Sequence, residues 1–416
     1  MGKRIYLCLA HMSEAGLEQK YIKEAFDTNW VAPLGPNVDG FEADLQDFVG
    51  MNKRVVALST GTAAVHLALL KCGVGPGDEV CVQSFTFCAS SHPITYLGAT
   101  PVFVDSEKDT WNMDPELLEV AVKDRIAKTG KKPKAIMPVA LYGMPYKIDR
   151  IMEIAHKYDI PVIEDAAEGF GSRFKGQVLG TFGKYGVLSF NGNKIITTSG
   201  GGALITESDD EWREIMMYAT QYRESYPYYQ HEKIGYNYRM SNICAGIGRG
   251  QMTVANDHIA HHQHVQKLYE TLLKDIPGIH VHTQPATGEY DSNYWLCAIT
   301  IDPEVKIQGQ EHAYKTVVQG AVGGAPGVIH MADSPTTDCQ PNDNVEALRV
   351  FMNAAGVEAR PVWKPMHKQP VYKGAPAYVN GVSEAIFKVG MCLPAGPWVS
   401  DEDVRYIVDC IKKAIV

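Results

Sequence analysis

The chain has 416 residues, of which 45% are hydrophobic and 21% are charged, and its formal net charge is −9. This composition predicts a soluble globular protein with one large domain and a smaller one, and it excludes disorder along the whole chain. The acidic balance argues against nucleic acid as the main partner, because a phosphate backbone requires a clustered positive surface.

The N-terminus, MGKRIYLCLAHMSEAG, has two basic residues before an apolar run of about six residues. A signal peptide needs an apolar run of roughly 7 to 15 residues, and a membrane span needs ~18. The nine cysteines contain no CxxC pair, which indicates reduced thiols rather than disulfides or a zinc site. We therefore expect a cytoplasmic protein with no membrane contact.

Between residues 54 and 206, β-rich runs alternate with segments of helical spacing, which predicts an α/β fold with a mainly parallel sheet between helices. We expect seven strands, at 54–59, 79–84, 100–105, 134–140, 160–165, 185–190 and 201–206. The last two strands follow one another without a helix between them, so one of them should be antiparallel.

Helical spacing between these strands predicts helices at 63–72, 87–98, 114–126 and 149–159. Gly73 suits the C-terminal end of the first helix. Asp114 and Pro115 suit the N-cap and the first turn of the third helix.

After Glu211 the character of the sequence changes. Residues 218–241 hold seven tyrosines in a loop-like stretch, and long helices should follow from Ser241 to Leu273. We interpret the tyrosines as dimer packing and sugar contacts rather than a base-stacking platform, because the chain is acidic. The Gly-rich segment 306–343 fits no element except a short strand at 327–330, and its role stays open.

These changes predict two domains. A large domain should span residues 1–255, and a linking helix with a smaller C-terminal α/β domain should span residues 256–416. On the linking helix, His258 and His262 lie four residues apart, a spacing seen in metal sites. No carboxylate or cysteine pattern supports a metal, so we expect a solvated or interface helix face and no metal site.

Three features at strand ends carry the chemistry. Residues 59–64, STGTAA, place Thr60 and Thr62 at a helix start, where N–H groups and hydroxyls bind phosphate. Asp165 ends a strand, the position at which ligands bind in open α/β sheets. Lys194 follows an Asn-Gly-Asn turn, and a lysine in a partly desolvated site can form a Schiff base. Taken singly, each could be structural: a capped helix start, a helix cap and an exposed lysine.

Together the three features match pyridoxal phosphate. Its phosphate needs a helix N-terminus with hydroxyls, its ring nitrogen needs a carboxylate, and its aldehyde needs a lysine amine. Ser189, just before the lysine turn, could add a hydroxyl to the phosphate. Phe87 could stack on the ring.

The stretches STGTAAVHLALLKCGVGPGDEV, VIEDAAEGFGS, SFNGNKIITTSGGGALIT and GYNYRMSNICAGIGRGQM resemble the DegT/StrS family of nucleotide-sugar aminotransferases. The resemblance covers nearly the whole chain. It implies a fold type I pyridoxal-phosphate enzyme, acting as a homodimer with both active sites at the subunit interface.

The resemblance also implies roles for individual residues. The matched positions around the cofactor ring are Lys194, which binds the aldehyde, Asp165, which pairs with the pyridinium, Glu168 and Phe87. Those around the phosphate are Thr60, Gly61, Thr62 and Ser189. The neighbouring subunit should contribute Asn237 and Arg239. Many family members carry Gln or His where this chain has Glu168.

A narrower group, the bacillosamine-type 4-aminotransferases, is similar in the stretches FNGNKIITTSGGG and ARPVWKPMHKQPVYKGAPAY. This resemblance implies transfer from L-glutamate to a UDP-linked 4-keto-6-deoxy-N-acetylhexosamine. The residues expected to bind the substrate are His11, Trp30, Pro33, Leu34, Trp363, Lys364 and His367.

Three alternatives stay open beside this assignment. The ketosugar could carry dTDP or GDP instead of UDP. A sugar dehydratase on the same scaffold would carry histidine in place of Lys194, so the lysine argues against it. A catalytically silent, cofactor-binding regulator would need no complete set of cofactor residues, and the set is complete here.

Overall fold

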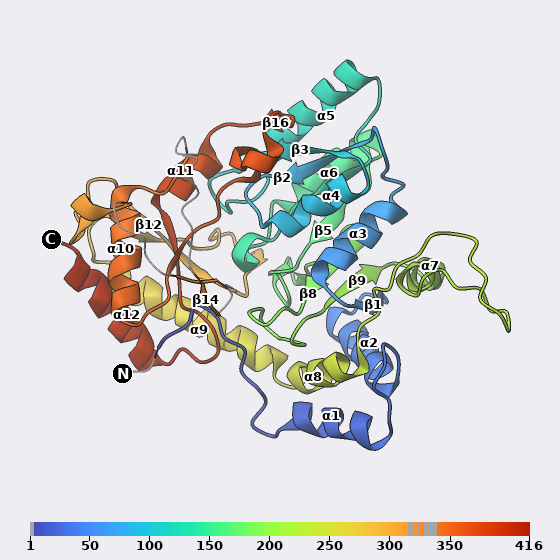
Figure 1. Ribbon diagram of the computed structural model, residues 1–416. Coiled ribbons are helices and arrows are strands. Elements are labelled where there is room, and N and C mark those ends of the chain that lie inside the picture. Colours follow the sequence, from blue (N-terminus) through green and yellow to red (C-terminus); the bar gives the residue numbers. More distant parts are fainter. Residues whose placement is uncertain (1–3, 315–319, 323–324, 328–338) are drawn as a thin grey trace.

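The computed structural model describes residues 4–314, 320–322, 325–327 and 339–416. A large sheet lies between helices, and a smaller sheet with its own helices lies beside it (Figure 1). No helix in these ranges is both long and apolar enough to cross a bilayer. All nine cysteines are free thiols, as the absence of paired spacings predicts.

All seven strands predicted in the first half of the chain form the large sheet. They are β1 (Arg54–Leu58), β2 (Glu79–Gln83), β3 (Thr100–Val104), β4 (Ala135–Met137), β5 (Ile163–Asp165), β8 (Tyr185–Ser189) and β9 (Gly202–Thr206). The strands pair in the order β1-β9-β8-β5 and, across bridges between the segments of β4 and β5, continue as β4-β2-β3. Only β9 is antiparallel to both of its neighbours, which confirms the expected reversal.

Helices cover both faces of this sheet. They are α3 (Gly61–Lys71), α4 (His92–Tyr96), α5 (Pro115–Thr129), α6 (Ile148–Tyr158) and α7 (Asp209–Ala219), with α1 (Leu17–Asp27), α2 (Pro36–Val49) and α8 (Asn242–Met252) packed beside β1. On α6, Ile148, Ile151 and Ile154 are buried, which is the one-face spacing of an amphipathic helix. Gly73, with φ +71°, follows the end of α3 in the left-handed conformation expected of it.

The predicted helix 87–98 forms only in part. The chain makes a 3-10 turn, η1 (Cys88–Ser90), and then the short helix α4. The Ser90 hydroxyl donates a hydrogen bond to the Asp165 carboxylate. Pro93 occupies the first turn of α4, where a residue without an N–H leaves no helical hydrogen bond unmade. The segment is therefore bent around a functional side chain instead of continuing as one helix.

The smaller sheet has the order β10-β12-β17-β15. Its strands are β10 (Ile279–Val281), β12 (Cys297–Ile301), β15 (Arg360–Pro361) and β17 (Gly390–Leu393), and its helices are α9 (Ala255–Leu273), α10 (Asp343–Ala354), α11 (Val382–Val389) and α12 (Asp401–Ala414). Helix α9 begins in the large core at Ala255 and ends in the small core at Leu273 (Figure 1). We propose a domain boundary at residue 255, where this helix begins.

Two segments cross between the parts. Near the N-terminus, Ile5 bridges Val357 and belongs to the small core. After the 3-10 turns η4 (Met366–Lys368) and η5 (Pro370–Tyr372), the short strand β16 (Ala377–Tyr378) pairs with β3 and extends the large sheet. The sequence from 366 to 380 therefore packs on the large sheet although the chain around it builds the small one.

Several minor elements complete the described residues. They are β6 (Arg173–Phe174), β7 (Gln177–Val178), β11 (Tyr290–Asp291), β13 (Gly320–Val322), β14 (Ala325–Gly327), η2 (Leu141–Gly143) and η3 (Gln310–His312). Strands β13 and β14 pair with each other. The strand predicted at 327–330 lies outside the described residues except for Gly327, the last residue of β14.

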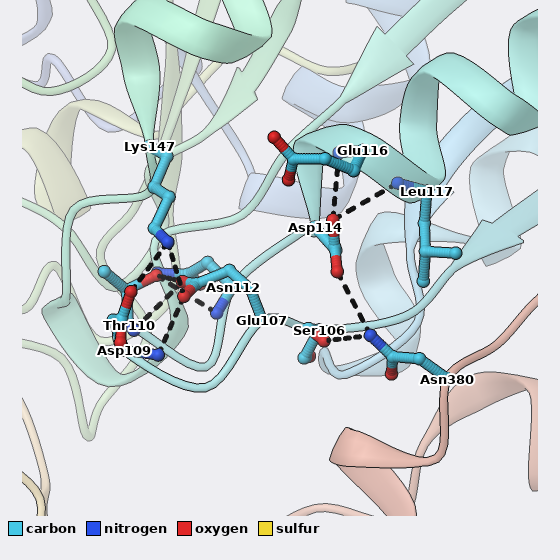
Figure 2. Close-up of polar contacts among 10 residues, drawn as sticks. All are labelled: Ser106, Glu107, Asp109, Thr110, Asn112, Asp114, Glu116, Leu117, Lys147 and Asn380. Carbon is cyan, nitrogen blue, oxygen red and sulfur yellow. Dashed lines mark hydrogen bonds and ion pairs between the residues drawn. The ribbon is translucent and has the colours of Figure 1, made fainter.

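The connection between β3 and α5 fixes three parts of the chain to one another (Figure 2). Asp114 accepts hydrogen bonds from the N–H groups of Glu116 and Leu117, which confirms it as the N-cap of α5. Asn380 donates to the carboxylate of Asp114 at 3.1 Å, and Lys147 pairs with Asp109 at 2.7 Å. The C-terminal segment and the start of α6 are thereby held at the edge of the large sheet.

The tyrosine-rich stretch is a loop that projects from the end of α7 (Figure 1). Arg223 and His231 form an isolated bridge in it, and Tyr226, Tyr228 and Tyr229 are exposed. The two predicted long helices after it are α8 and α9. The role of the tyrosines in dimer packing and sugar contacts stays a prediction.

Candidate active site

The candidate site lies where β5 and β8 end. These strands are parallel neighbours, so their carboxyl ends meet at one edge of the sheet. Asp165 is the last residue of β5, and the turn after β8 carries Lys194. The Lys194 amine lies 3.5 Å from the Glu168 carboxylate. The parallel direction of β5 and β8 thus brings together Asp165, Glu168 and Lys194, the three residues that we expect around a cofactor ring.

Asp165 is a buried carboxylate with two donors. The Ser90 hydroxyl donates to it at 2.6 Å and the N–H of Ala167 at 3.2 Å. Burial raises the pKa of Asp165, while Ser90, Ala167 and the charge of Lys194 act in the opposite direction. A carboxylate held in this way is able to stabilise a cation that reaches the same pocket.

Glu168 lies in an environment that changes its protonation near neutral pH. Burial raises the pKa of Glu168 to about 7, against the opposing charge of Lys194 and the hydrogen bond from the N–H of Tyr142. That N–H lies 2.7 Å from the carboxylate. Tyr142 has φ +54°, a strained conformation for a tyrosine, and Asn112 holds the surrounding turn through the N–H of Leu141.

The residues expected around the phosphate lie together at the start of α3. Thr60 caps the helix by accepting from the N–H of Ala63, and a Cβ built on Gly61 would lie 3.1 Å from the Cβ of Ser189. In the described part of the chain, the N–H groups of Gly61 and Thr62 have no hydrogen-bond acceptor. These groups and the Ser189 hydroxyl form the donor set that an anion needs. With Asp165 and Lys194, they fit the three reactive ends of pyridoxal phosphate.

The glycines after the lysine have different roles. A Cβ on Gly202 would lie 2.4 Å from the Gly61 nitrogen, whereas a Cβ on Gly200 would have no neighbour within 4 Å. Gly202 therefore lets β9 pass directly against the start of α3. Because this contact is with backbone rather than with a flexible side chain, it leaves no room for a larger residue.

Gly202→Ala is expected to displace the start of α3. We expect a loss of roughly 1 to 3 kcal/mol in stability, typical of overpacking, and weaker binding of the cofactor phosphate. Gly200→Ala is the matched control and should change neither. Thermal unfolding and fluorescence titration with pyridoxal phosphate measure the two effects. Equal behaviour of the two variants would contradict the close contact.

Aromatic side chains surround the pocket. Phe87 is 54% exposed, and its ring centre lies 5.5 Å from that of Trp363. Trp363 also packs on Tyr142 and donates its backbone N–H to the Tyr142 hydroxyl at 2.9 Å. Phe87 is thus free to stack on a ring, and Trp363 connects the C-terminal part to the turn that contacts Glu168.

The other predicted substrate residues lie in two places. Lys364 is half-buried next to Trp363, and His367 is hydrogen-bonded to the Ser84 hydroxyl at 2.6 Å. His11 packs edge-on against Trp398. Burial lowers the pKa of His367, so its ring is neutral near pH 7. The segment that carries Lys364 and His367 is therefore fixed to the end of β2.

Trp30, Pro33 and Leu34 lie on the exposed connection between α1 and α2. Asn242 holds this connection by donating to the Trp30 carbonyl at 2.8 Å. Among the described residues, none of the three forms a hydrogen bond or cation–π contact with Lys194. Their role in substrate binding stays a prediction.

The two residues expected from a partner subunit differ in accessibility. Asn237 is exposed. The Arg239 side chain is only 8% exposed, pairs with Glu42 and donates to the Ala57 carbonyl at 2.9 Å. In this chain Arg239 therefore ties the segment to β1, and Asn237 is the one that is available to a second subunit.

Of the two settings expected for the histidines of α9, a solvated or an interface helix face, the solvated face is wrong. His258 is buried and donates to the Ile195 carbonyl at 3.0 Å, and His262 is buried and donates to the Tyr294 carbonyl at 3.2 Å. The reason is that the first half of α9 packs inside the large core. Within the described ranges, no three His, Cys, Asp or Glu side chains are grouped as metal ligands.

Three residues of the site have no motif in the sequence. Ser90 supports Asp165 from within a segment predicted as a helix. Asn293 donates to the carbonyls of Glu168 and Phe170, and Trp295 lies against the Lys194 amine. Asn293 and Trp295 come from about 100 positions after the lysine, and only the packing of the small sheet brings them there.

The chain is similar to known proteins along nearly its whole length. A family model described as the DegT/DnrJ/EryC1/StrS aminotransferase family matches residues 13–322 and 310–412. EpsN of Bacillus subtilis (strain 168), whose name is that of a pyridoxal phosphate-dependent aminotransferase, is 40% identical over 415 residues, which cover 99% of this chain and 96% of EpsN. GDP-perosamine synthase of Escherichia coli O157:H7 is 32% identical over 410 residues, with 98% of each chain covered.

A solved structure shows a similar fold. An aminotransferase from Brucella abortus superposes with a TM-score of 0.81 at 27% identity, and the match covers 96% of this chain and 95% of that one. The likeness extends over both sheets because nearly the whole of each chain is aligned.

Proposed function

Because the chain belongs to the DegT/DnrJ/EryC1/StrS aminotransferase family, we propose that it moves an amino group from L-glutamate to the 4-keto group of a UDP-linked 4-keto-6-deoxy-N-acetylhexosamine. The enzyme is a pyridoxal phosphate-dependent nucleotide-sugar aminotransferase. The donor, the nucleotide and the ketosugar are parts of the proposal.

The observation that carries the proposal is the Lys194 amine 3.5 Å from Glu168, beside the buried Asp165. When bound, pyridoxal phosphate supplies an electron sink and carries the amino group between the two substrates. Lys194 would hold the cofactor aldehyde, and its amine would be tethered where it can move the proton at the reacting carbon. Asp165 would keep the ring nitrogen protonated, and Glu168 would lie near the same ring.

The sugar substrate is assigned to the exposed aromatic surface above the site. Phe87 and Trp363 offer apolar faces, and Lys364 beside them carries a positive charge suited to a diphosphate. We propose that His11, Trp30 and Leu34 complete the sugar-nucleotide site. A homodimer would bring Asn237 of a second subunit to the phosphate.

The relatives support a second candidate. The Escherichia coli relative is a GDP-perosamine synthase, and its 32% identity extends along 98% of this chain. A GDP-linked ketosugar is therefore the main alternative to the UDP-linked one. The UDP-linked assignment rests on the similarity of the segments around Lys194 and Trp363 to the bacillosamine type.

A substrate panel tests the proposal. The purified enzyme is incubated with glutamate and, separately, with UDP-, GDP- and dTDP-linked 4-keto-6-deoxy sugars, and amine formation is followed by mass spectrometry. We expect the UDP-linked N-acetylated sugar to react fastest. Preference for a GDP-linked sugar would replace the proposed substrate, and no amination of any sugar would support a silent regulator.

A further inference from the structure

The Lys194 amine has an asymmetric environment. On one side lies the Glu168 carboxylate at 3.5 Å, a distance at the outer limit of a hydrogen bond. Among the described residues, Glu168 is the one carboxylate within ion-pair distance of this amine, while the buried Asp165 interacts with its charge from farther away. The Lys194 side chain is 13% exposed, so water contributes little to its solvation. A free ammonium in this pocket needs a further stabilising group.

The Trp295 ring supplies such a group. The Lys194 nitrogen lies 3.9 Å from the centre of the Trp295 ring, well inside the range of a cation–π contact. Trp295 is 3% exposed, and contacts of this kind are stronger where water is excluded. The ring attracts a cation but cannot accept a proton from it. It therefore holds the ammonium in place without removing the proton that the reaction needs.

Trp295 is fixed in this position by its polar contacts. Its indole N–H donates to the Asn193 carbonyl at 2.6 Å, so the Trp295 side chain is bonded to the turn that carries the lysine. Its backbone N–H donates to the Asn293 side chain at 2.8 Å. Asn293 in turn donates to the Glu168 carbonyl at 2.8 Å. The segment 293–295 thus holds both the lysine turn and the backbone of Glu168.

The charge of Glu168 alone is an incomplete partner for the lysine. Burial raises the pKa of Glu168 to about 7, so near neutral pH a substantial share of this carboxyl is protonated. The aromatic ring keeps its attraction for the ammonium whichever form Glu168 takes. The ring is therefore a partner for the ammonium that does not itself titrate.

We propose that Trp295 is a positioning residue that holds the Lys194 ammonium while the lysine is free of the cofactor. The inference rests on the proposed function only in assuming that Lys194 is released during turnover. Trp295 is too buried to be a main sugar contact. Its effect should therefore fall on the chemical step and not on sugar binding.

The test compares Trp295→Phe with Trp295→Leu in the full-length protein loaded with pyridoxamine phosphate, in which the lysine is free. Acetic anhydride labels neutral amines, and mass spectrometry gives the labelling rate of Lys194 relative to that of the exposed Lys23. Phenylalanine keeps a ring face, whereas leucine has similar bulk without one. We expect leucine to speed labelling of Lys194 about three- to tenfold over phenylalanine.

Equal labelling of Lys194 in the two variants would overturn the proposal, whatever their difference from the wild type. Similar thermal midpoints of the two variants exclude misfolding as the cause.

In the sugar assay we expect kcat to fall further for leucine than for phenylalanine, with KM for the sugar unchanged. A raised KM with unchanged kcat would instead make Trp295 a sugar contact. The labelling result does not depend on which sugar reacts, so it stands apart from the substrate panel.

Discussion

Replacing Lys194 by alanine is expected to remove the visible absorbance of the bound cofactor and to lower amine formation by at least about 10²–10⁴-fold. The lysine is both the covalent attachment of the cofactor and the group placed to move the proton. Its amine lies among Glu168, Asp165 and Trp295, and no other lysine contacts any of these three among the described residues. Absorbance spectra and the mass-based sugar assay measure the two effects.

Lys184→Ala is the matched control for this prediction. Lys184 precedes β8 on the same part of the chain, and its side chain is 43% exposed with a distant pairing to Glu211 at 3.8 Å. Loss of such a surface pair should cost little. The assignment of the site fails if Lys194→Ala keeps the absorbance band and the turnover of the wild type.

The large sheet could be predicted because its signals are local. Each of the seven strands is a short β-rich run next to a helix or a turn, and the close spacing of β8 and β9 revealed the antiparallel reversal. The chemistry at Asp165 and Lys194 was also visible, since parallel strands place their carboxyl ends at one edge. The helix start at Thr60, where we expect the phosphate to bind, followed from the strand-to-helix boundary.

The rest of the site depends on contacts between distant segments. Trp295 and Asn293 reach Lys194 and Glu168 only because the small sheet packs beside the large one. His258 was expected on a solvated or interface face of its helix, yet it is buried against the carbonyl of Ile195. Periodicity shows which face of a helix is apolar, but it does not show that polar histidines can be buried against backbone carbonyls.

Asp165→Asn is expected to lower turnover by about 10²–10³-fold, the usual cost of removing an aligned electrostatic group. The neutral amide keeps the size of the carboxylate but cannot hold a proton on the ring nitrogen of the cofactor. Ser90→Ala is the control, because it removes the 2.6 Å hydrogen bond and leaves the charge. We expect the serine variant to lose less than about tenfold, because Asp165 keeps its charge and its hydrogen bond from the Ala167 N–H.

The same substitution should have the opposite effect on stability. Burial raises the pKa of Asp165 above the ordinary value of an aspartate, so the folded protein binds this proton more tightly than the unfolded chain does. The stability that comes from the protonated form is present below about pH 4 and is lost as the pH rises through the folded pKa. An asparagine does not ionise, so Asp165→Asn avoids the loss of stability that the wild type undergoes when Asp165 gives up its proton. The cofactor-free variant should therefore unfold at a higher temperature than the wild type near pH 7. The gain should shrink as the pH falls, and thermal unfolding across the pH range measures it.

A variant that is both less active and less stable at every pH would mean that Asp165 is mainly a structural partner of Ser90. The opposite signs are expected only if the carboxylate is kept at a cost in stability for the charge that it presents to the cofactor.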